Sequence, residues 1–229
     1  MVLAVSLLVA CTTSESPQEN TDTQEVAQET QKEQPAAKSA AKAAFKAALG
    51  TGSFEYQVTY DVAATYGDQS SKLVMTQYFK DAKMRTDSEV SGIQTQAYLV
   101  GNVVTSCTRF SGDWMCQETT LQETSMENPS YAARNQAESA AADVKEDDTM
   151  QVAGVTADCY LVTTQAGTTR YCVHDNVPLY VKTTTSQGTS EVKARSYSKT
   201  VADSVFIPPA SASESPAYQL PPGVDIPDY

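Results

Sequence analysis

The clearest pattern in the chain is a strict alternation of apolar and polar residues beginning at Phe54. The apolar members are Phe54, Tyr56, Val58, Tyr60 and Val62. A period of two is typical of a strand with one buried face. Similar segments between short turns predict further strands over residues 73–79, 84–90, 93–100, 103–109, 114–119, 155–164, 168–174, 179–186 and 190–199. Short turns between successive strands favour an antiparallel meander.

Two alanine-rich segments depart from this pattern and predict helices. The first, residues 35–49, carries a lysine stripe (Lys38, Lys42, Lys46) opposite a thin apolar face (Ala37, Ala41, Ala44, Phe45, Ala48). We expect the stripe to be a solvated face, with contact to lipid head groups as the alternative. The second helix is expected over residues 131–145, after a cap at Asn128. The acidic run 146–148 is expected to be its solvated exit.

A short apolar run, residues 2–10, ends at Cys11. It is far shorter than the roughly 20 residues of a membrane-spanning helix, but it matches the core of a secretory signal. Leu8-Val9-Ala10-Cys11 resembles the lipobox of prokaryotic lipoproteins, although no Lys or Arg precedes the run. We therefore expect residues 1–10 to be a signal peptide and Cys11 to be lipidated. An ordinary signal peptide containing a cysteine is the alternative.

The segment after Cys11 is polar throughout. Residues 12–34 contain no glycine and no aromatic residue, but six acidic residues and one lysine. Such a sequence cannot bury enough apolar surface to offset its ordering entropy. We expect residues 11–35 to be a lipidated cysteine with a flexible tether, an unanchored disordered tail being the alternative. A domain would follow over 36–208 and a proline-rich, extended tail over 209–229.

The cysteines number five, and four remain if Cys11 is lipidated. Cys107 and Cys116 flank one turn signal, and Cys159 and Cys172 flank another, so each pair lies on the two arms of an expected hairpin. Disulfides persist in the oxidising environment that exported proteins meet. We expect the pairs 107–116 and 159–172, with free thiols or a metal site as alternatives. The spacings and the single histidine, His174, argue against metal.

Charge and motifs narrow the classes of function. The net charge of −12 argues against nucleic-acid binding and against electrostatic adhesion to an anionic membrane. No P-loop, GxSxG or HExxH motif occurs, and His174 beside Asp175 is the only candidate base. We expect His174 to be a surface residue. The sequence therefore predicts no catalytic residue, no cofactor and no metal, although paired carboxylates cannot be placed from it.

Three segments carry a resemblance to a known family: residues 54–58, then 78–80 with 83–85, and the closing segment 203–208. With the order of elements, they resemble the LolA/LolB-like lipoprotein-carrier superfamily over about residues 45–208. The resemblance implies an α+β fold in which a curved, unclosed antiparallel sheet, or half-barrel, has an N-terminal helix and a helix insert against its concave face. It also implies that acyl chains are held between sheet and helices.

The residues expected to line such an apolar site are Phe54, Tyr56, Val58, Tyr60, Leu73, Met75, Met84, Ile93, Leu99 and Trp114. The alternative is that they only form the core. The expected function is that of an exported lipoprotein, anchored through Cys11 to the cell membrane or envelope, that binds or transfers a lipid or another apolar ligand. An anchored interaction or structural module without a ligand is the alternative, and the sequence identifies no protein partner.

Overall fold

The computed structural model describes residues 34–50, 55–121, 133 and 142–214. The expected signal peptide, Cys11 and all but the last two residues of the expected tether lie outside the described residues, as do Phe54 and residues 215–229 of the expected tail. The elements whose bounds the structure describes are one α-helix, twelve strands and one short 3-10 helix.

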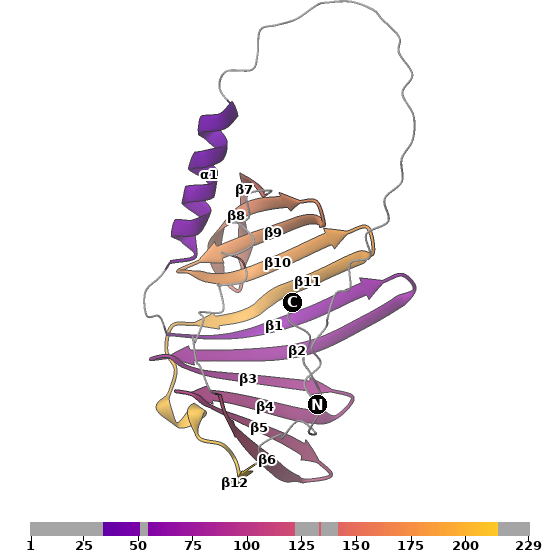
Figure 1. Ribbon diagram of the computed structural model, residues 1–229, viewed down its shortest axis with the longest axis vertical. Coiled ribbons are helices and arrows are strands. Elements are labelled where there is room, and N and C mark those ends of the chain that lie inside the picture. The colour runs from indigo at the N-terminus through magenta and orange to yellow at the C-terminus, as the bar shows by residue number, and fades with distance from the viewer. Residues whose placement is uncertain (1–33, 51–54, 122–132, 134–141, 215–229) are drawn as a thin grey trace, which may run out of the picture. The chain divides into compact units, whose positions relative to one another are not determined.

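A single twelve-stranded sheet forms the fold (Figure 1). The strands run in chain order as β1 (Tyr56–Tyr66), β2 (Gln69–Lys80), β3 (Lys83–Val90), β4 (Ile93–Val100), β5 (Val103–Phe110), β6 (Asp113–Thr120), β7 (Asp143–Val152), β8 (Val155–Thr164), β9 (Gly167–His174), β10 (Val177–Thr185), β11 (Gly188–Ser198) and β12 (Ala212–Glu214). Their spatial order is β12-β6-β5-β4-β3-β2-β1-β11-β10-β9-β8-β7. Neighbours are antiparallel throughout, except that β12 is parallel to β6.

Strand β1 joins two meanders, because it pairs with β2 on one side and with β11 on the other. The outermost strands β12 and β7 do not pair with each other, so the curved sheet stays unclosed. With one packed helix, this is the α+β, half-barrel class that the sequence predicted. The strand predictions from residue 56 to 120 and from 155 to 199 are confirmed to within a few residues.

Helix α1 (Gln34–Ala48) defines one face of the sheet, which we call the helix face. The ring of Phe45 lies 5.0 Å from Tyr160 on β8 and 5.2 Å from Tyr171 on β9. Side chains on paired residues of adjacent strands share a face. The register links these tyrosines to β1 and β2 in one row of partners: Tyr160, Tyr171, Val181, Val192, Val62 and Leu73.

One cluster of the core lies between this face and α1. Phe45 and Leu49 are fully buried with Tyr160 and Tyr171, and this cluster accounts for the thin apolar side of α1. Ala133 is the one described residue of the expected helix insert before residue 142, and it is helical and buried in the same cluster. The other residues of the insert before residue 142 lie outside the described residues.

The predicted second helix is wrong at its C-terminal end. Residues 143–152 form the edge strand β7, so Lys145 and the acidic run 146–148 are extended and are no helix exit. Val144 pairs with Val162 on β8 and is buried, and Asp147 forms an ion pair with Arg170 at 2.6 Å. Pairing with β8 therefore outweighs the local preference for helix, and charged side chains suit an exposed sheet edge.

Both expected disulfides are present. Cys107 on β5 is bonded to Cys116 on β6, and Cys159 on β8 is bonded to Cys172 on β9. In each case the two cysteines are direct cross-strand partners, and all four are buried. Each bond therefore fastens one hairpin of a different meander.

Candidate functional site

Most of the residues expected to line an apolar site lie on the helix face. Tyr56, Val58 and Tyr60 of β1 are buried in a core cluster with Leu179 and the Cys159–Cys172 disulfide, separate from the cluster around Phe45 of α1. Burial raises the pKa of both tyrosines. Cross-strand partners extend the face outward from β1. The further expected residues on it are Leu73, Met75, Met84, Leu99 and Ile93, which are partly buried except for Ile93 at 37% exposure.

Trp114 departs from this arrangement. It pairs with Arg109, which pairs with Gln94, and these residues lie on the opposite face of the sheet. There Trp114 packs against Tyr98 and the buried Cys107–Cys116 disulfide. Trp114 therefore cannot share one apolar site with Tyr56 or Met84.

A pocket of about 270 Å³ opens on this opposite face, across strands β2, β3 and β4. Its lining is mostly polar: Val74, Thr76, Asp87, Ser88, Glu89, Gln94, Thr95, Gln96 and Trp114. Sites for small molecules usually combine a concave surface with a few placed polar groups. The sequence reasoning missed this pocket, because it depends on the register of three strands.

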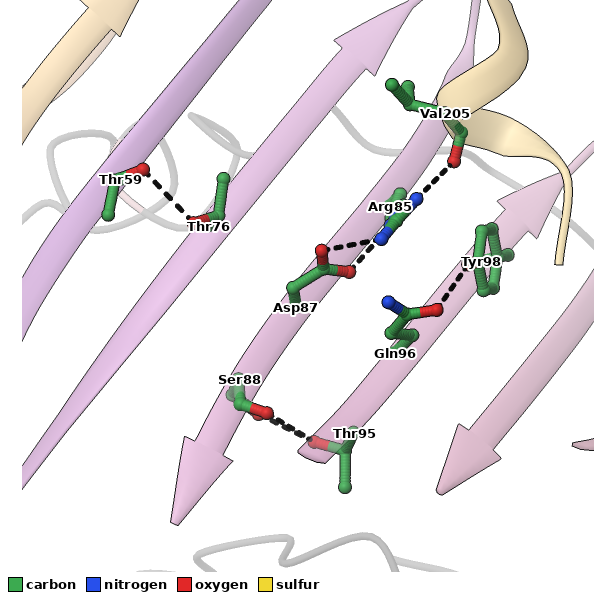
Figure 2. A network of polar contacts seen from close by, with 9 residues as sticks. All are labelled: Thr59, Thr76, Arg85, Asp87, Ser88, Thr95, Gln96, Tyr98 and Val205. Atoms are coloured by element: carbon green, nitrogen blue, oxygen red, sulfur yellow. Dashed lines mark hydrogen bonds and ion pairs between the residues drawn. The ribbon is translucent and has the colours of Figure 1, made fainter. Parts of the chain in front are cut away.

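Asp87, one of the lining residues, forms an ion pair with Arg85, the residue two positions before it on β3 (Figure 2). The Arg85 guanidinium donates from Nε and Nη2 to the two carboxylate oxygens of Asp87, at 2.6 and 2.7 Å. It also lies 5.2 Å from the ring centroids of Tyr78 and Tyr98, which flank it on β2 and β4. Burial alone would lower the pKa of Arg85, but the hydrogen bond and charge of Asp87 outweigh it and raise that pKa. Arg85 thus stays charged and fixed.

The same arginine fastens the C-terminal segment, residues 201–214. Its Nη1 donates to the carbonyl oxygen of Val205 in the 3-10 helix η1 (Asp203–Phe206), at 2.7 Å. Lys80 donates to the carbonyl of Val201 and pairs with Asp203 at 3.3 Å. The closing motif that carried the family resemblance therefore positions this segment on the sheet, and β12 continues it along the edge strand β6.

Two glutamine side chains have defined orientations at the pocket. The Tyr98 hydroxyl donates to Oε1 of Gln96 at 2.6 Å, so the amide nitrogen of Gln96 points away from Tyr98 (Figure 2). Gln94 donates from Nε2 to the Glu89 carboxylate at 3.2 Å. Burial raises the pKa of Tyr98, so its phenol keeps the proton it donates. The pocket thus presents an amide donor beside carboxylate acceptors.

His174, the only histidine, lies at the end of β9. Its Nδ1 donates to the carbonyl of Thr156 at 2.8 Å, and its Nε2 lies 2.9 Å from Asp175. A hydrogen bond from Lys199 lowers the pKa of Asp175. Among the described residues, no serine or cysteine side chain is hydrogen-bonded to His174, so these contacts form no nucleophile–base pair.

The described residues hold no group of three or more His, Cys, Asp or Glu side chains placed to bind a metal ion. Nor does any described helix have the length and apolar composition needed to cross a membrane.

Comparison with known proteins finds similarity in structure but none in sequence. The sequence matches no family of known proteins, and no curated protein matches it. An uncharacterized conserved protein from Thermus thermophilus superimposes with a TM-score of 0.48 at 10% identity, over 77% of this chain and 97% of that one. The structure of the Pseudomonas aeruginosa MucA/MucB complex superimposes with a TM-score of 0.47 at 14% identity, over 81% of this chain and 67% of that one.

A LolA superfamily protein from Nitrosomonas europaea gives a TM-score of 0.40 at 10% identity, over 75% of this chain and 98% of that one. Structures of the LolA superfamily are thus among those this chain resembles, as the sequence pattern indicated. Likeness at this level concerns the arrangement of strands and carries no information about ligand or activity.

Proposed function

We propose that this protein is an exported lipoprotein, anchored through a lipid on Cys11, that binds an acyl chain or a similar apolar ligand on the helix face and catalyses no reaction. The lipobox-like segment 8–11 and the polar sequence after it support the anchor. The two buried disulfides support an oxidising, extracytoplasmic location.

The observation that carries the ligand proposal is the graded burial of apolar side chains along the helix face. Val58 on β1 is fully buried, Met75 and Met84 on the next strands pack partly buried against the same core, and Leu99 on β4 is partly buried. The apolar surface therefore continues from the core towards solvent without a change of face.

Physical chemistry favours an alkyl chain on such a surface. Each methylene group removed from water contributes about 0.8 kcal/mol, so a chain of several carbons binds without any polar contact. Methionine side chains such as Met75 and Met84 adapt to irregular apolar shapes because they are unbranched and flexible. An acidic protein gains nothing from charge attraction to a fatty acid, so apolar burial would have to dominate.

A fluorescent fatty acid tests the proposal. The full chain carrying Cys11→Ser, which cannot be acylated, is titrated with cis-parinaric acid, and a saturable rise in probe fluorescence is expected. Leu99→Asp should raise the dissociation constant at least roughly tenfold, because it places a carboxylate in the apolar contact.

The matched control is Val100→Asp. Val100 is the next residue on β4, is apolar and 41% exposed, and lies on the opposite face. This variant should bind the probe within about twofold of the parent chain. An equal loss of affinity for the probe in both variants, or no saturable binding of the probe by the parent chain, would refute an acyl site on the helix face.

One observation favours an anchored interaction module instead. Val90 and Met115 lie on the helix face but are 51% and 63% exposed. Large exposed apolar residues on one face are typical of surfaces that contact another protein. A parent chain that fails to bind the fatty acid would leave this function as the better explanation.

A further inference from the structure

The polar pocket on the opposite face lies apart from the proposed acyl site and is unsuited to an alkyl chain. Thr76, Asp87 and Gln96 lie side by side on three strands as direct cross-strand partners. Covering these groups with methylene carbons would remove their water without replacing its hydrogen bonds. The pocket therefore calls for a polar ligand.

Charge excludes strongly charged ligands. The bidentate pair cancels the charges of Arg85 and Asp87. Glu89 remains, but Arg109 lies on the same face, two strands away in the same row of partners, and is centred 6.0 Å from the Trp114 ring. The charged residues of the lining itself are Asp87 and Glu89, so the pocket repels an anion, while the pairing of Asp87 with Arg85 leaves little net charge to hold a cation.

The hydrogen-bonding groups suit hydroxyls. The Gln96 amide nitrogen has no hydrogen-bond partner among the described residues, and the Tyr98 contact fixes it as a donor. The Gln94 contact leaves one Glu89 carboxylate oxygen as an acceptor. A hydroxyl group both donates and accepts, so neighbouring hydroxyls on one ring match donors and acceptors placed side by side.

The pocket also has an aromatic side. Trp114 is half-buried and contributes an apolar ring to a lining that is otherwise mostly polar. A pyranose ring has hydroxyls around its edge and C–H groups on its faces, so one molecule meets both kinds of surface. From this combination we infer that the pocket between β2, β3, β4 and Trp114 binds a neutral hexose unit of a saccharide.

The fluorescence of tryptophan provides a direct test, because Trp114 is the only tryptophan in the chain. The full chain with Cys11→Ser is titrated with glucose, mannose and N-acetylglucosamine, and with the disaccharides maltose and chitobiose. A saturable change in Trp114 emission is expected with at least one neutral sugar. Glucose 6-phosphate should bind more weakly than glucose because Asp87 and Glu89 face the ligand.

Two variants test whether the sugar binds in the polar pocket. Gln96→Leu removes the amide donor, and Glu89→Gln keeps the shape of an exposed side chain while removing its charge. Each should weaken sugar binding about tenfold, as expected for one charged or well-placed hydrogen bond. Gln117→Leu is the control, since Gln117 is exposed on the helix face of β6. It should leave sugar binding within about twofold.

Three outcomes would overturn the inference. They are no saturable response to any neutral sugar, a response to glucose 6-phosphate alone, and binding unaffected by both Gln96→Leu and Glu89→Gln. None of them bears on fatty acid binding, so the proposed function and this inference fail or stand separately.

Discussion

Replacing Phe45 by alanine is expected to lower the free energy of unfolding by about 3–5 kcal/mol. Phe45 is fully buried and is the residue through which α1 contacts the rings of Tyr160 and Tyr171. Truncation would leave a cavity between the helix and strands β8 and β9. Urea denaturation followed by circular dichroism measures the loss.

The control for this variant is Tyr66→Ala. Tyr66 is an aromatic residue of similar size at the end of β1, but it is 54% exposed. Its truncation should cost less than about 1 kcal/mol. If Phe45→Ala cost no more than Tyr66→Ala, the helix would not be packed on the sheet, and the assignment of the helix face would be wrong.

Removing both disulfides should destabilise the protein by about 6 kcal/mol. The bonds join cysteines 9 and 13 residues apart, and each closed loop of this size contributes about 3 kcal/mol through the entropy of the unfolded chain. The two effects should be nearly additive, since the bonds lie in separate clusters of the core. The variants Cys107→Ala/Cys116→Ala, Cys159→Ala/Cys172→Ala and their combination are compared by urea denaturation.

The intact mass gives an independent check on the pairing. With Cys11→Ser, the exported chain should be lighter by four hydrogens without reductant than with it. Alkylation before reduction should modify none of the four cysteines. An unchanged mass, or alkylation of Cys159 or Cys172 in the folded protein, would contradict the disulfides and with them the extracytoplasmic location.

The alternating pattern of the sequence predicted most of the sheet because strands such as β1 bury one face more than the other. Tyr56, Val58 and Tyr60 show this plainly, and the cysteine pairs followed from the turns between them. Helix propensity failed at residues 143–145, because it is a local quantity and the pairing of β7 with β8 is not. The sequence of a charged edge strand such as β7 does not indicate which strand it pairs with.

The polar pocket could not be predicted for a related reason. Arg85 and Asp87 are two residues apart, so alternation places them on one face, but their neighbours come from elsewhere. Val205, which accepts a hydrogen bond from Arg85, is 120 residues away in sequence. The prediction that Trp114 lines the apolar site with the other expected residues was wrong, because apolar character alone does not determine which face of the sheet a residue occupies. The two-residue turn at Ser111 and Gly112 instead sets Trp114 opposite Arg109.

Native mass spectrometry of the full chain carrying Cys11→Ser, purified without added lipid from an exporting host, tests the central claim most directly. A fraction of the protein is expected to retain non-covalent lipid, and Leu99→Asp should abolish this fraction while Val100→Asp does not. Repeated preparations of the parent chain free of lipid, which also take up none when lipid is supplied, would contradict an acyl-binding function.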